Sequence, residues 1–226
     1  MDHVSGPTGA PISVLIVDDD ALVRSALTLM LGGQRDIHVV GEAGDGAEGL
    51  RKAASLRPDV VLMDIRMPVM NGLEATRALH RDSDPPAVIV LTTFDADEHV
   101  VGAVAAGADG FLLKDTPPTE IVSAIRLVAG GEAMLSPSAT RSLLRQVRAG
   151  APDDRATEAG SRIDLLTLRE REVAVCVGRG LSNAEIAAEL YLSVPTVKAH
   201  VSRLFDKLDV TNRVQIAMVV HDAGLV

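Results

Sequence analysis

Large aromatic side chains are almost missing from this chain of 226 residues, which has one tyrosine, three phenylalanines and no tryptophan. Its hydrophobic content is nonetheless 47%, as in folded globular domains. Any core must therefore be built from aliphatic side chains. Because the chain is longer than one ordinary domain needs and shorter than three would use, we expect two domains.

Cysteine is also scarce, since Cys176 stands alone. A single cysteine excludes an internal disulfide. Cys176 lies in an apolar helical run between Val173 and Val177, where a small core side chain in a reducing compartment is a simpler interpretation than a reactive thiol.

Long apolar runs are missing as well. No stretch approaches the roughly 18 residues that a membrane span needs. Residues 1–11 are polar and lack the apolar centre of a secretory signal. We therefore expect a soluble, cytoplasmic protein that begins with a flexible tail over residues 1–11.

Charge is distributed unevenly along the chain, whose formal net charge is −9. Residues 1–161 hold 14 basic and 23 acidic residues and carry the whole excess, whereas residues 162–226 hold 8 of each. A strongly acidic region is unsuited to nucleic acid, but a neutral one can bind DNA if its basic residues cluster.

Residues 12–130 alternate short, nearly continuous apolar runs with amphipathic segments. β-branched runs of this kind are typical of parallel strands buried on both faces. The expected strands are Ile12–Val17, Ile37–Gly41, Val60–Met63, Ala87–Leu91 and Gly110–Leu113. Helices are expected near 21–32, 46–56, 72–81, 95–106 and 118–130. This alternation predicts an open, doubly wound α/β sheet, with its functional crevice at the carboxyl ends of the strands.

The region between the two expected domains has a different composition. Residues 137–148 could form one more helix, whereas residues 149–162 are rich in alanine, glycine and charge and show no apolar period. The latter pattern predicts a flexible linker. We therefore divide the chain into a first domain over 12–133, a linker over 134–162 and a second domain over 163–226.

The second domain has a purely helical pattern. Four capping positions predict four helix starts, at Thr167, Ser182, Ser193 and either Thr211 or Asn212. Pro195 is tolerated in the first turn of the third helix. Two short helices joined by Leu192 and Ser193 indicate a helix-turn-helix, so this domain is expected to be all-α.

Polar side chains follow four of the five expected strands: Asp18 to Asp20 after the first, Asp64 at the third, Thr92 at the fourth and Lys114 at the fifth. These strand ends meet at one edge of a parallel sheet. Clustered carboxylates repel one another unless a cation neutralises them. A site with only oxygen ligands suits Mg²⁺.

These residues are suited to accepting a phosphoryl group. A metal-bound aspartate is a competent nucleophile toward phosphorus, Lys114 could pair with a phosphoryl oxygen, and the Thr92 hydroxyl could donate to another. Taken singly, each residue has a plain structural explanation, such as Asp20 capping a helix. Their joint placement favours a phosphoryl-accepting pocket.

The motifs IVDDD, VVLMDIRMPVMNG, VIVLTTF and GFLLKD stand at the first, third, fourth and fifth strands. With them, residues 12–130 resemble the receiver domain of the response-regulator family. The resemblance implies a flavodoxin-like, five-stranded parallel sheet with strand order 2-1-3-4-5.

The resemblance also implies roles for single residues. It implies Asp64 as the phosphoacceptor, and Mg²⁺ held by Asp18, Asp19, Asp64 and the backbone carbonyl of Arg66. Thr92, which precedes Lys114 by 22 residues, and Lys114 itself would contact the phosphoryl group, and Phe111 would be the aromatic switch residue. Asp115 stands where many receivers have a proline, which removes the usual expectation of a cis bond.

A glycine-rich motif offers a different interpretation, because residues 44–49 (GDGAEG) fit the dinucleotide-binding pattern G-x-G-x-x-G. That fingerprint belongs in the first strand-to-helix turn, where backbone amides hold pyrophosphate. Here the first turn carries three aspartates, which would repel a pyrophosphate. We expect residues 44–49 to be a turn only.

The segments LTLREREV, GLSNAEIAAELYLSVPTVKAHVSRLFDKL and TNRVQIA resemble the LuxR-type helix-turn-helix. Together with a receiver they imply a NarL/FixJ-type response regulator, which is not an enzyme. In the third helix Val197, Val201, Leu204, Phe205 and Leu208 form one apolar stripe, and the opposite face is basic or small. The resemblance implies base contacts by Lys198, Ala199 and Ser202 and phosphate contacts by Thr196, Arg203 and Lys207.

The neutral charge of the second domain predicts modest non-specific affinity for DNA, and one such module buries only about 600–1,000 Å². A twofold homodimer on inverted half-sites would restore affinity, and the last helix has apolar surface for it. We therefore expect a transcription regulator whose dimerisation and binding to double-stranded promoter DNA are switched when a sensor histidine kinase phosphorylates Asp64.

Two alternatives remain open. The first is constitutive DNA binding with a vestigial receiver, against which the intact pocket argues. The second is a Mg²⁺-dependent phosphatase in which Asp18 is the nucleophile and Asp20 the second acid. Such enzymes need a substrate-covering cap, and no insertion before Asp64 is long enough for one.

Overall fold

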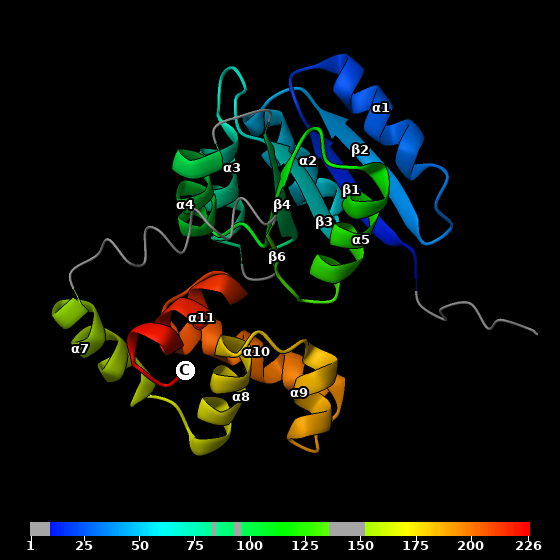
Figure 1. The fold of residues 1–226 in the computed structure, drawn as a ribbon. Coiled ribbons are helices and arrows are strands. Elements are labelled where there is room, and N and C mark those ends of the chain that lie inside the picture. Colours follow the sequence, from blue (N-terminus) through cyan, green and yellow to red (C-terminus); the bar gives the residue numbers. More distant parts are fainter. Residues whose placement is uncertain (1–9, 83–84, 93–95, 136–151) are drawn as a thin grey trace, which may run out of the picture.

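The computed structural model describes residues 10–82, 85–92, 96–135 and 152–226. They form an α/β domain followed by a helical domain that lies against one end of it (Figure 1). None of the described helices is long and apolar enough to cross a membrane.

The sheet of the first domain is parallel, with the order β2-β1-β3-β4-β5-β6. Its strands are β1 (Ile12–Val17), β2 (Ile37–Ala43), β3 (Val60–Asp64), β4 (Ala87–Thr92), β5 (Gly110–Leu113) and β6 (Met134–Leu135). The expected order 2-1-3-4-5 is confirmed. The edge strand β6 is a correction, because the sequence placed Met134 and Leu135 in the linker; two residues are too few to show a strand pattern.

Five helices cover the two faces of this sheet: α1 (Ala21–Leu31), α2 (Gly46–Leu56), α3 (Gly72–Leu79), α4 (Ala96–Ala106) and α5 (Pro118–Ala129). Alternate residues of β1 point to opposite faces, as the period of a strand requires. Leu15 and Val17 pack with side chains of α2, α3 and α4, whereas Val14 and Ile16 pack with α1 and α5. The expected aliphatic core is therefore two cores, one on each face.

The second domain contains α7 (Pro152–Ile163), α8 (Leu168–Gly178), α9 (Asn183–Glu189), α10 (Val194–Leu208) and α11 (Arg213–Asp222). The expected helix starts are confirmed. Thr167 and Ser182 form capping boxes, Ser193 accepts from the backbone N–H of Thr196, and Asn212, not Thr211, caps the last helix.

The prediction of a flexible linker through residue 162 is wrong for its second half, because α7 occupies residues 152–163. Ala159 and Ile163 are 5% and 3% exposed, and Ile163 joins the core of the helical domain. Two apolar residues one turn apart are too weak a pattern to recognise in a charged segment. The helix expected over 137–148 lies outside the described residues.

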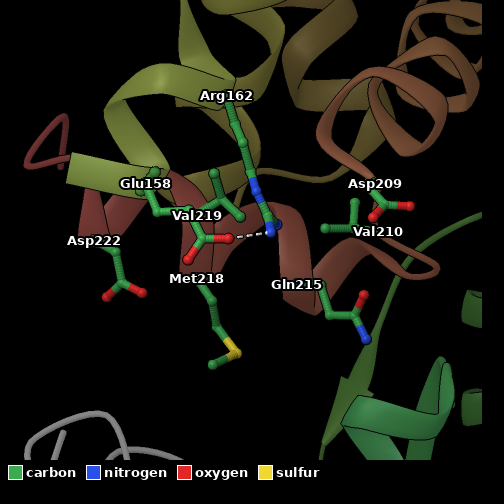
Figure 2. A pocket seen from close by; sticks show the side chains of 9 residues that line it. Glu158, Arg162, Asp209, Val210, Gln215, Met218, Val219 and Asp222 are labelled. Atoms are coloured by element: carbon green, nitrogen blue, oxygen red, sulfur yellow. Dashed lines mark hydrogen bonds and ion pairs between the residues drawn. The ribbon is translucent and has the colours of Figure 1, made fainter. Parts of the chain in front are cut away.

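A pocket lies between α7 and α11, and Figure 2 shows the side chains that line it. Its apolar lining comes from Ala159, Val210, Met218 and Val219. Arg162 pairs there with Glu158 at 2.6 Å and donates to the backbone carbonyl of Leu208 at 3.2 Å. A hydrogen bond to the end of α10 therefore holds α7 on the helical domain in addition to the burial of Ala159 and Ile163.

Candidate functional site

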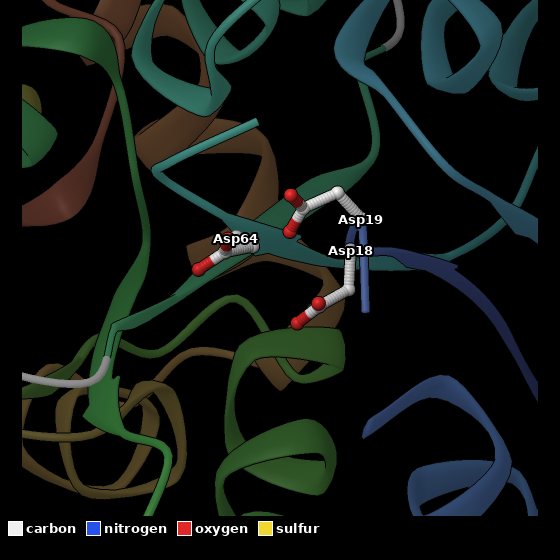
Figure 3. Close-up of side chains that lie close together, drawn as sticks. All are labelled: Asp18, Asp19 and Asp64. Atoms are coloured by element: carbon white, nitrogen blue, oxygen red, sulfur yellow. The ribbon is translucent and has the colours of Figure 1, made fainter. Parts of the chain in front are cut away.

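Three carboxylates meet at the carboxyl ends of β1 and β3. Asp18, Asp19 and Asp64 each offer an oxygen, and these oxygens lie within 4.8 Å of one another (Figure 3). Asp18 is 1% and Asp64 5% exposed, whereas Asp19 is exposed to solvent. The structure thus brings together the acidic side chains that the sequence placed at this edge.

Lys114 joins this group from the end of β5. Its Nζ lies 2.6 Å from Oδ2 of Asp18 and 3.1 Å from Oδ1 of Asp64. The backbone N–H of Lys114 donates to the carbonyl of Thr92 at 2.8 Å, which fixes the strand end from which the side chain extends. A single ammonium group therefore bridges two buried carboxylates.

The charges of the pocket do not balance. Burial raises the pKa of Asp64, and the charge of Lys114 opposes that rise. Burial also acts to lower the pKa of Lys114, but its hydrogen bond to Asp18 and the charge of Asp64 outweigh it and raise that pKa. One cation thus faces three carboxyl groups, which leaves negative charge for a further cation, and an oxygen-only donor set fits Mg²⁺.

The loop after β3 is shaped by a glycine that the sequence reasoning missed. The backbone N–H of Gly72 donates to the carbonyl of Ile65 at 2.9 Å, and a Cβ at Gly72 would lie only 1.9 Å from the carbonyl oxygen of Asp64. Asn71 caps α3 with Glu74 in a capping box. The Asn-Gly pair at 71–72 was the available sequence signal. Arg66 lies in this loop, two residues beyond Asp64, and is exposed.

Asp20 caps a helix and is not a member of the carboxylate group. Its Oδ1 accepts from the backbone N–H of Leu22 at 2.8 Å, which caps α1, and its own backbone N–H donates to Asp18 at 2.9 Å. This arrangement argues against the phosphatase alternative, which needs Asp20 as an acid beside Asp18.

Thr92 and Phe111 lie on neighbouring strands behind the pocket. Thr92 is 2% exposed and Phe111 is fully buried. The Phe111 ring belongs to the core that also holds Val100 and Ala103 of α4, and Phe111 pairs with Val90 across β4 and β5. The ring of the expected aromatic switch residue therefore already lies inside the domain in this conformation.

The glycine-rich segment 44–49 is a turn that opens α2, as expected. Asp45 caps this helix by accepting from the backbone N–H of Glu48 at 2.8 Å, and the Glu48 carboxylate accepts from the backbone N–H of Gly44 at 2.9 Å. Two of the backbone amides in this segment thus already donate to acidic side chains of the same segment.

The helix α10 has the two faces that the sequence predicted. Val197, Val201, Leu204 and Leu208 are buried. Lys198, Ala199, Ser202 and Arg203 are exposed together on the other side. The hydroxyl of Thr196 shares a hydrogen bond of 2.7 Å with that of Ser193 at the start of the helix.

Lys207 differs from the other basic residues of α10, because it is paired inside its own domain. Its Nζ lies 2.7 Å from Oε2 of Glu170. Glu170 is 4% exposed, and the hydrogen bond from Lys207 lowers the pKa of its carboxyl to about 2. This pair joins α8 to α10, a contact that spacing alone could not reveal. Cys176 is buried in the same core, as expected.

Comparison with known proteins identifies both domains. Residues 14–126 match the response regulator receiver domain family, and residues 164–220 match the luxR family of bacterial regulatory proteins. The chain belongs to the response regulators. It is a two-component transcription regulator with a receiver and a LuxR-type DNA-binding domain, in a family of DNA-binding regulators and not of enzymes.

Relatives match this response regulator over nearly its whole length. The transcriptional regulatory protein LiaR of Bacillus subtilis (strain 168) is 40% identical over 215 residues, which cover 95% of this chain and 99% of LiaR. The nitrate/nitrite response regulator protein NarL of Escherichia coli (strain K12) is 37% identical and covers 93% of this chain and 95% of NarL. The crystal structure of ChrA, a response regulator in a heme-sensing two-component system, has 34% identity and a TM-score of 0.53, covering 96% of this chain and all of ChrA.

Proposed function

We propose that this response regulator accepts a phosphoryl group on Asp64 from a sensor histidine kinase, and that the modification controls dimerisation and binding to promoter DNA. The observation that carries the proposal is the buried Asp64 carboxylate, held 3.1 Å from Lys114 within the group of Asp18, Asp19 and Asp64. A receiver implies a histidine kinase as partner, and the LuxR-type domain implies DNA. Because DNA is the target, we place its action in the cytoplasm.

In the proposed transfer an Asp64 carboxylate oxygen attacks the phosphorus, and the bond from phosphorus to the histidine nitrogen of the kinase breaks. The nitrogen keeps the electron pair. Lys114 is already within 3.1 Å of Asp64 and would pair with a phosphoryl oxygen. Thr92, at the end of β4, would donate its hydroxyl to another.

A divalent cation fits the pocket because its donors are all oxygens and its negative charge exceeds that of Lys114. Asp18, Asp19, Asp64 and the backbone carbonyl of Arg66 would hold Mg²⁺. When bound, it would neutralise carboxylate and phosphoryl oxygens that otherwise repel one another.

For the switch we propose two states of the region around β4, β5 and α4, whose populations phosphorylation shifts. Thr92 and Phe111 would couple the pocket to α4, since Phe111 shares a core with Val100 and Ala103 of that helix. Because the ring is already buried, the change would be a shift of α4 on this ring.

For DNA binding we propose that α10 enters the major groove. Lys198, Ala199 and Ser202 would contact bases, and Thr196 and Arg203 phosphates. Lys207 would reach a phosphate only by sharing or leaving its ion pair with Glu170. Two copies would read inverted half-sites as a homodimer.

Intact-mass measurement after incubation with a small phosphodonor and Mg²⁺ tests the acceptor. Wild type should gain one phosphoryl group and Asp64→Asn none. Asp20→Asn is the matched control, because asparagine also caps helices and Asp20 caps α1; it should gain the group as wild type does. Incorporation into Asp64→Asn at the wild-type level would refute the proposal.

A further inference from the structure

Arg24 of α1 reaches back to the end of the strand that carries the acidic pair. Its Nη1 donates to the backbone carbonyl of Asp18 at 2.7 Å, and its own backbone N–H donates to the carbonyl of Asp20 at 3.1 Å. Helical side chains lean toward the start of their helix, so a long side chain in the first turn can reach a residue that precedes the helix. The hydrogen bond from the guanidinium therefore goes to the backbone of the loop between β1 and α1.

A second contact fixes the direction of this guanidinium. Nε of Arg24 lies 3.4 Å from Oε2 of Glu42 near the end of β2, and Oε1 of the same carboxylate accepts from the hydroxyl of Thr28 at 2.8 Å. Because the N–H groups of arginine lie in one rigid plane, the contact with Glu42 sets the direction in which Nη1 points. A lysine has a single nitrogen and could not make both contacts in this geometry.

Asp18 is anchored in the sheet, but the chain leaves the sheet directly after it. The backbone N–H of Asp18 donates to the carbonyl of Ala43 at 3.1 Å, and its Oδ2 lies 2.6 Å from Nζ of Lys114. The carbonyl of Asp18 lies beyond the last residue of β1, so it needs a donor that the neighbouring strands no longer supply. Arg24 supplies that donor.

Both peptide planes that flank Asp19 are held by hydrogen bonds. The carbonyl of Asp18 and the N–H of Asp19 share one plane, and Arg24 holds the carbonyl of that plane. The plane after Asp19 includes the N–H of Asp20, which donates to Oδ1 of Asp18 at 2.9 Å. Asp19 itself is exposed. The direction of its carboxylate therefore depends on the backbone that carries it, and of the two hydrogen bonds only the one from Arg24 comes from outside the loop.

We propose that Arg24 is a positioning residue for the divalent cation, because it orients the loop so that the carboxylate of Asp19 points toward those of Asp18 and Asp64 (Figure 3). Glu42 acts one step further out by orienting Arg24. This inference rests on the proposed function, since the cation belongs to that proposal. Residues that orient metal ligands without touching the metal contribute strongly to metal affinity.

Charge and position predict opposite effects for the loss of Arg24. If Arg24 acted only through its positive charge, removing it would make the pocket more negative and tighten the binding of Mg²⁺. If it orients Asp19, removing it weakens the binding of Mg²⁺. Arg24→Gln removes the charge and Arg24→Lys keeps it, and both lose the guanidinium that joins Asp18 to Glu42. We therefore expect weaker binding in both variants.

The test uses the full-length, unphosphorylated chain. Tm is measured against Mg²⁺ concentration at constant ionic strength, which gives a dissociation constant for each protein, and Tm in chelator reports on the fold alone. Both variants should bind Mg²⁺ about tenfold more weakly than wild type. Arg126→Lys is the matched control, because Arg126 pairs with Asp36 just before β2, at the opposite end of the sheet. The affinity of this control for Mg²⁺ should equal that of wild type.

Intact-mass measurement with a small phosphodonor gives a second readout. In both Arg24 variants the rate of phosphoryl incorporation should reach half its maximum at about tenfold more Mg²⁺. The maximal rate at saturating Mg²⁺ should stay within about twofold of wild type, because the ligands and Asp64 are unchanged.

Arg24 variants that bind Mg²⁺ as wild type does would overturn the inference, even if their Tm in chelator is lower, because Arg24 would then only stabilise the fold. Tighter binding by Arg24→Gln with no change in Arg24→Lys would also overturn it, because only charge would matter. In either case wild type would still be phosphorylated on Asp64 and the proposed function would stand. A wild type that neither binds Mg²⁺ nor gains a phosphoryl group would overturn both.

Discussion

Lys114 lies closer to Asp18 than to Asp64, with Nζ at 2.6 Å from the first carboxylate and 3.1 Å from the second. The lysine is therefore anchored mainly by a residue that we do not expect to be modified. It can keep its contact with Asp18 while its remaining hydrogens turn to a phosphoryl group on Asp64. The same ammonium also offsets the repulsion between two buried carboxylates.

The first prediction concerns this charge balance. Lys114→Gln removes the positive charge that lies between Asp18 and Asp64. The stability of the folded protein should then depend more strongly on a divalent cation that neutralises these carboxylates. We expect Mg²⁺ to raise Tm more in Lys114→Gln than in wild type, measured by thermal unfolding with Mg²⁺ and with a chelator. Lys52→Gln is the control, because Lys52 pairs with Glu48 at a partly exposed site. Equal gains in all three proteins would contradict the account.

The second prediction concerns the loop that follows Asp64. Gly72→Ala places a methyl group 1.9 Å from the carbonyl oxygen of Asp64, so the loop must shift. We expect a loss of about 1–3 kcal/mol in the free energy of unfolding, measured by urea denaturation, together with slower phosphorylation. Gly160→Ala is the matched control, since a Cβ there meets nothing within 4 Å in α7 and alanine favours a helix. A stable, normally phosphorylated Gly72→Ala would be the contrary result.

The third prediction concerns pH. Burial raises the pKa of Asp109 from 3.8 to about 7, against the hydrogen bond from the backbone N–H of Val88. Between these values the folded state binds a proton that the unfolded chain releases, so the contribution of Asp109 to stability falls as pH rises from about 4 to about 7. Asp109→Asn should remove this pH-dependent contribution to the free energy of unfolding.

Urea denaturation of wild type and Asp109→Asn across this range measures the effect. Burial lowers the pKa of His80, so the contribution of His80 to stability rises with pH. Both proteins contain His80, and the difference between their free energies of unfolding therefore reports on Asp109 alone. The stability of the variant relative to wild type should increase steadily from pH 4 to 7. A difference that stays constant over the range would rule out the shifted titration.

The fourth prediction separates two exposed residues of α10. Arg203→Ala should weaken binding similarly on all DNA sequences and reduce the salt slope by about 1, as expected for a lost phosphate contact. On a DNA site selected from random sequence by the wild-type protein, Lys198→Ala should lower the magnitude of the binding free energy by about 1–3 kcal/mol. It should also relax the preference at one base position. Anisotropy titrations at several salt concentrations distinguish the two, and identical behaviour would argue against the assigned roles.

How much of the molecule the sequence could predict depends on the range of the interaction. The strands, the helix starts and the residues at the sheet edge follow from local patterns, and the strand order from the resemblance, so Asp18, Asp64 and Lys114 were placed correctly. Long-range contacts were not predictable in this way. The pair of Lys207 with Glu170 joins residues 37 positions apart, and the bond from Asn212 to Val104 spans 108.

Weak local patterns account for the remaining errors. The helix α7 carries its core contacts on Ala159 and Ile163 within a polar segment, so its composition suggested a linker. The strand β6 has two residues and depends on β5 for its hydrogen bonds. The motifs identify Phe111 as the aromatic switch residue, but they do not show that its ring is buried. That burial depends on the packing of α4 around the ring.

The most direct test of the central claim is the affinity for a two-half-site duplex, measured for wild type and Asp64→Asn with and without phosphodonor and Mg²⁺. The account predicts that the phosphodonor tightens wild-type binding at least about tenfold and leaves Asp64→Asn at the untreated value. Equal affinity and equal response in the two proteins would contradict it, because the carboxylate of Asp64 would then have no part in controlling DNA binding.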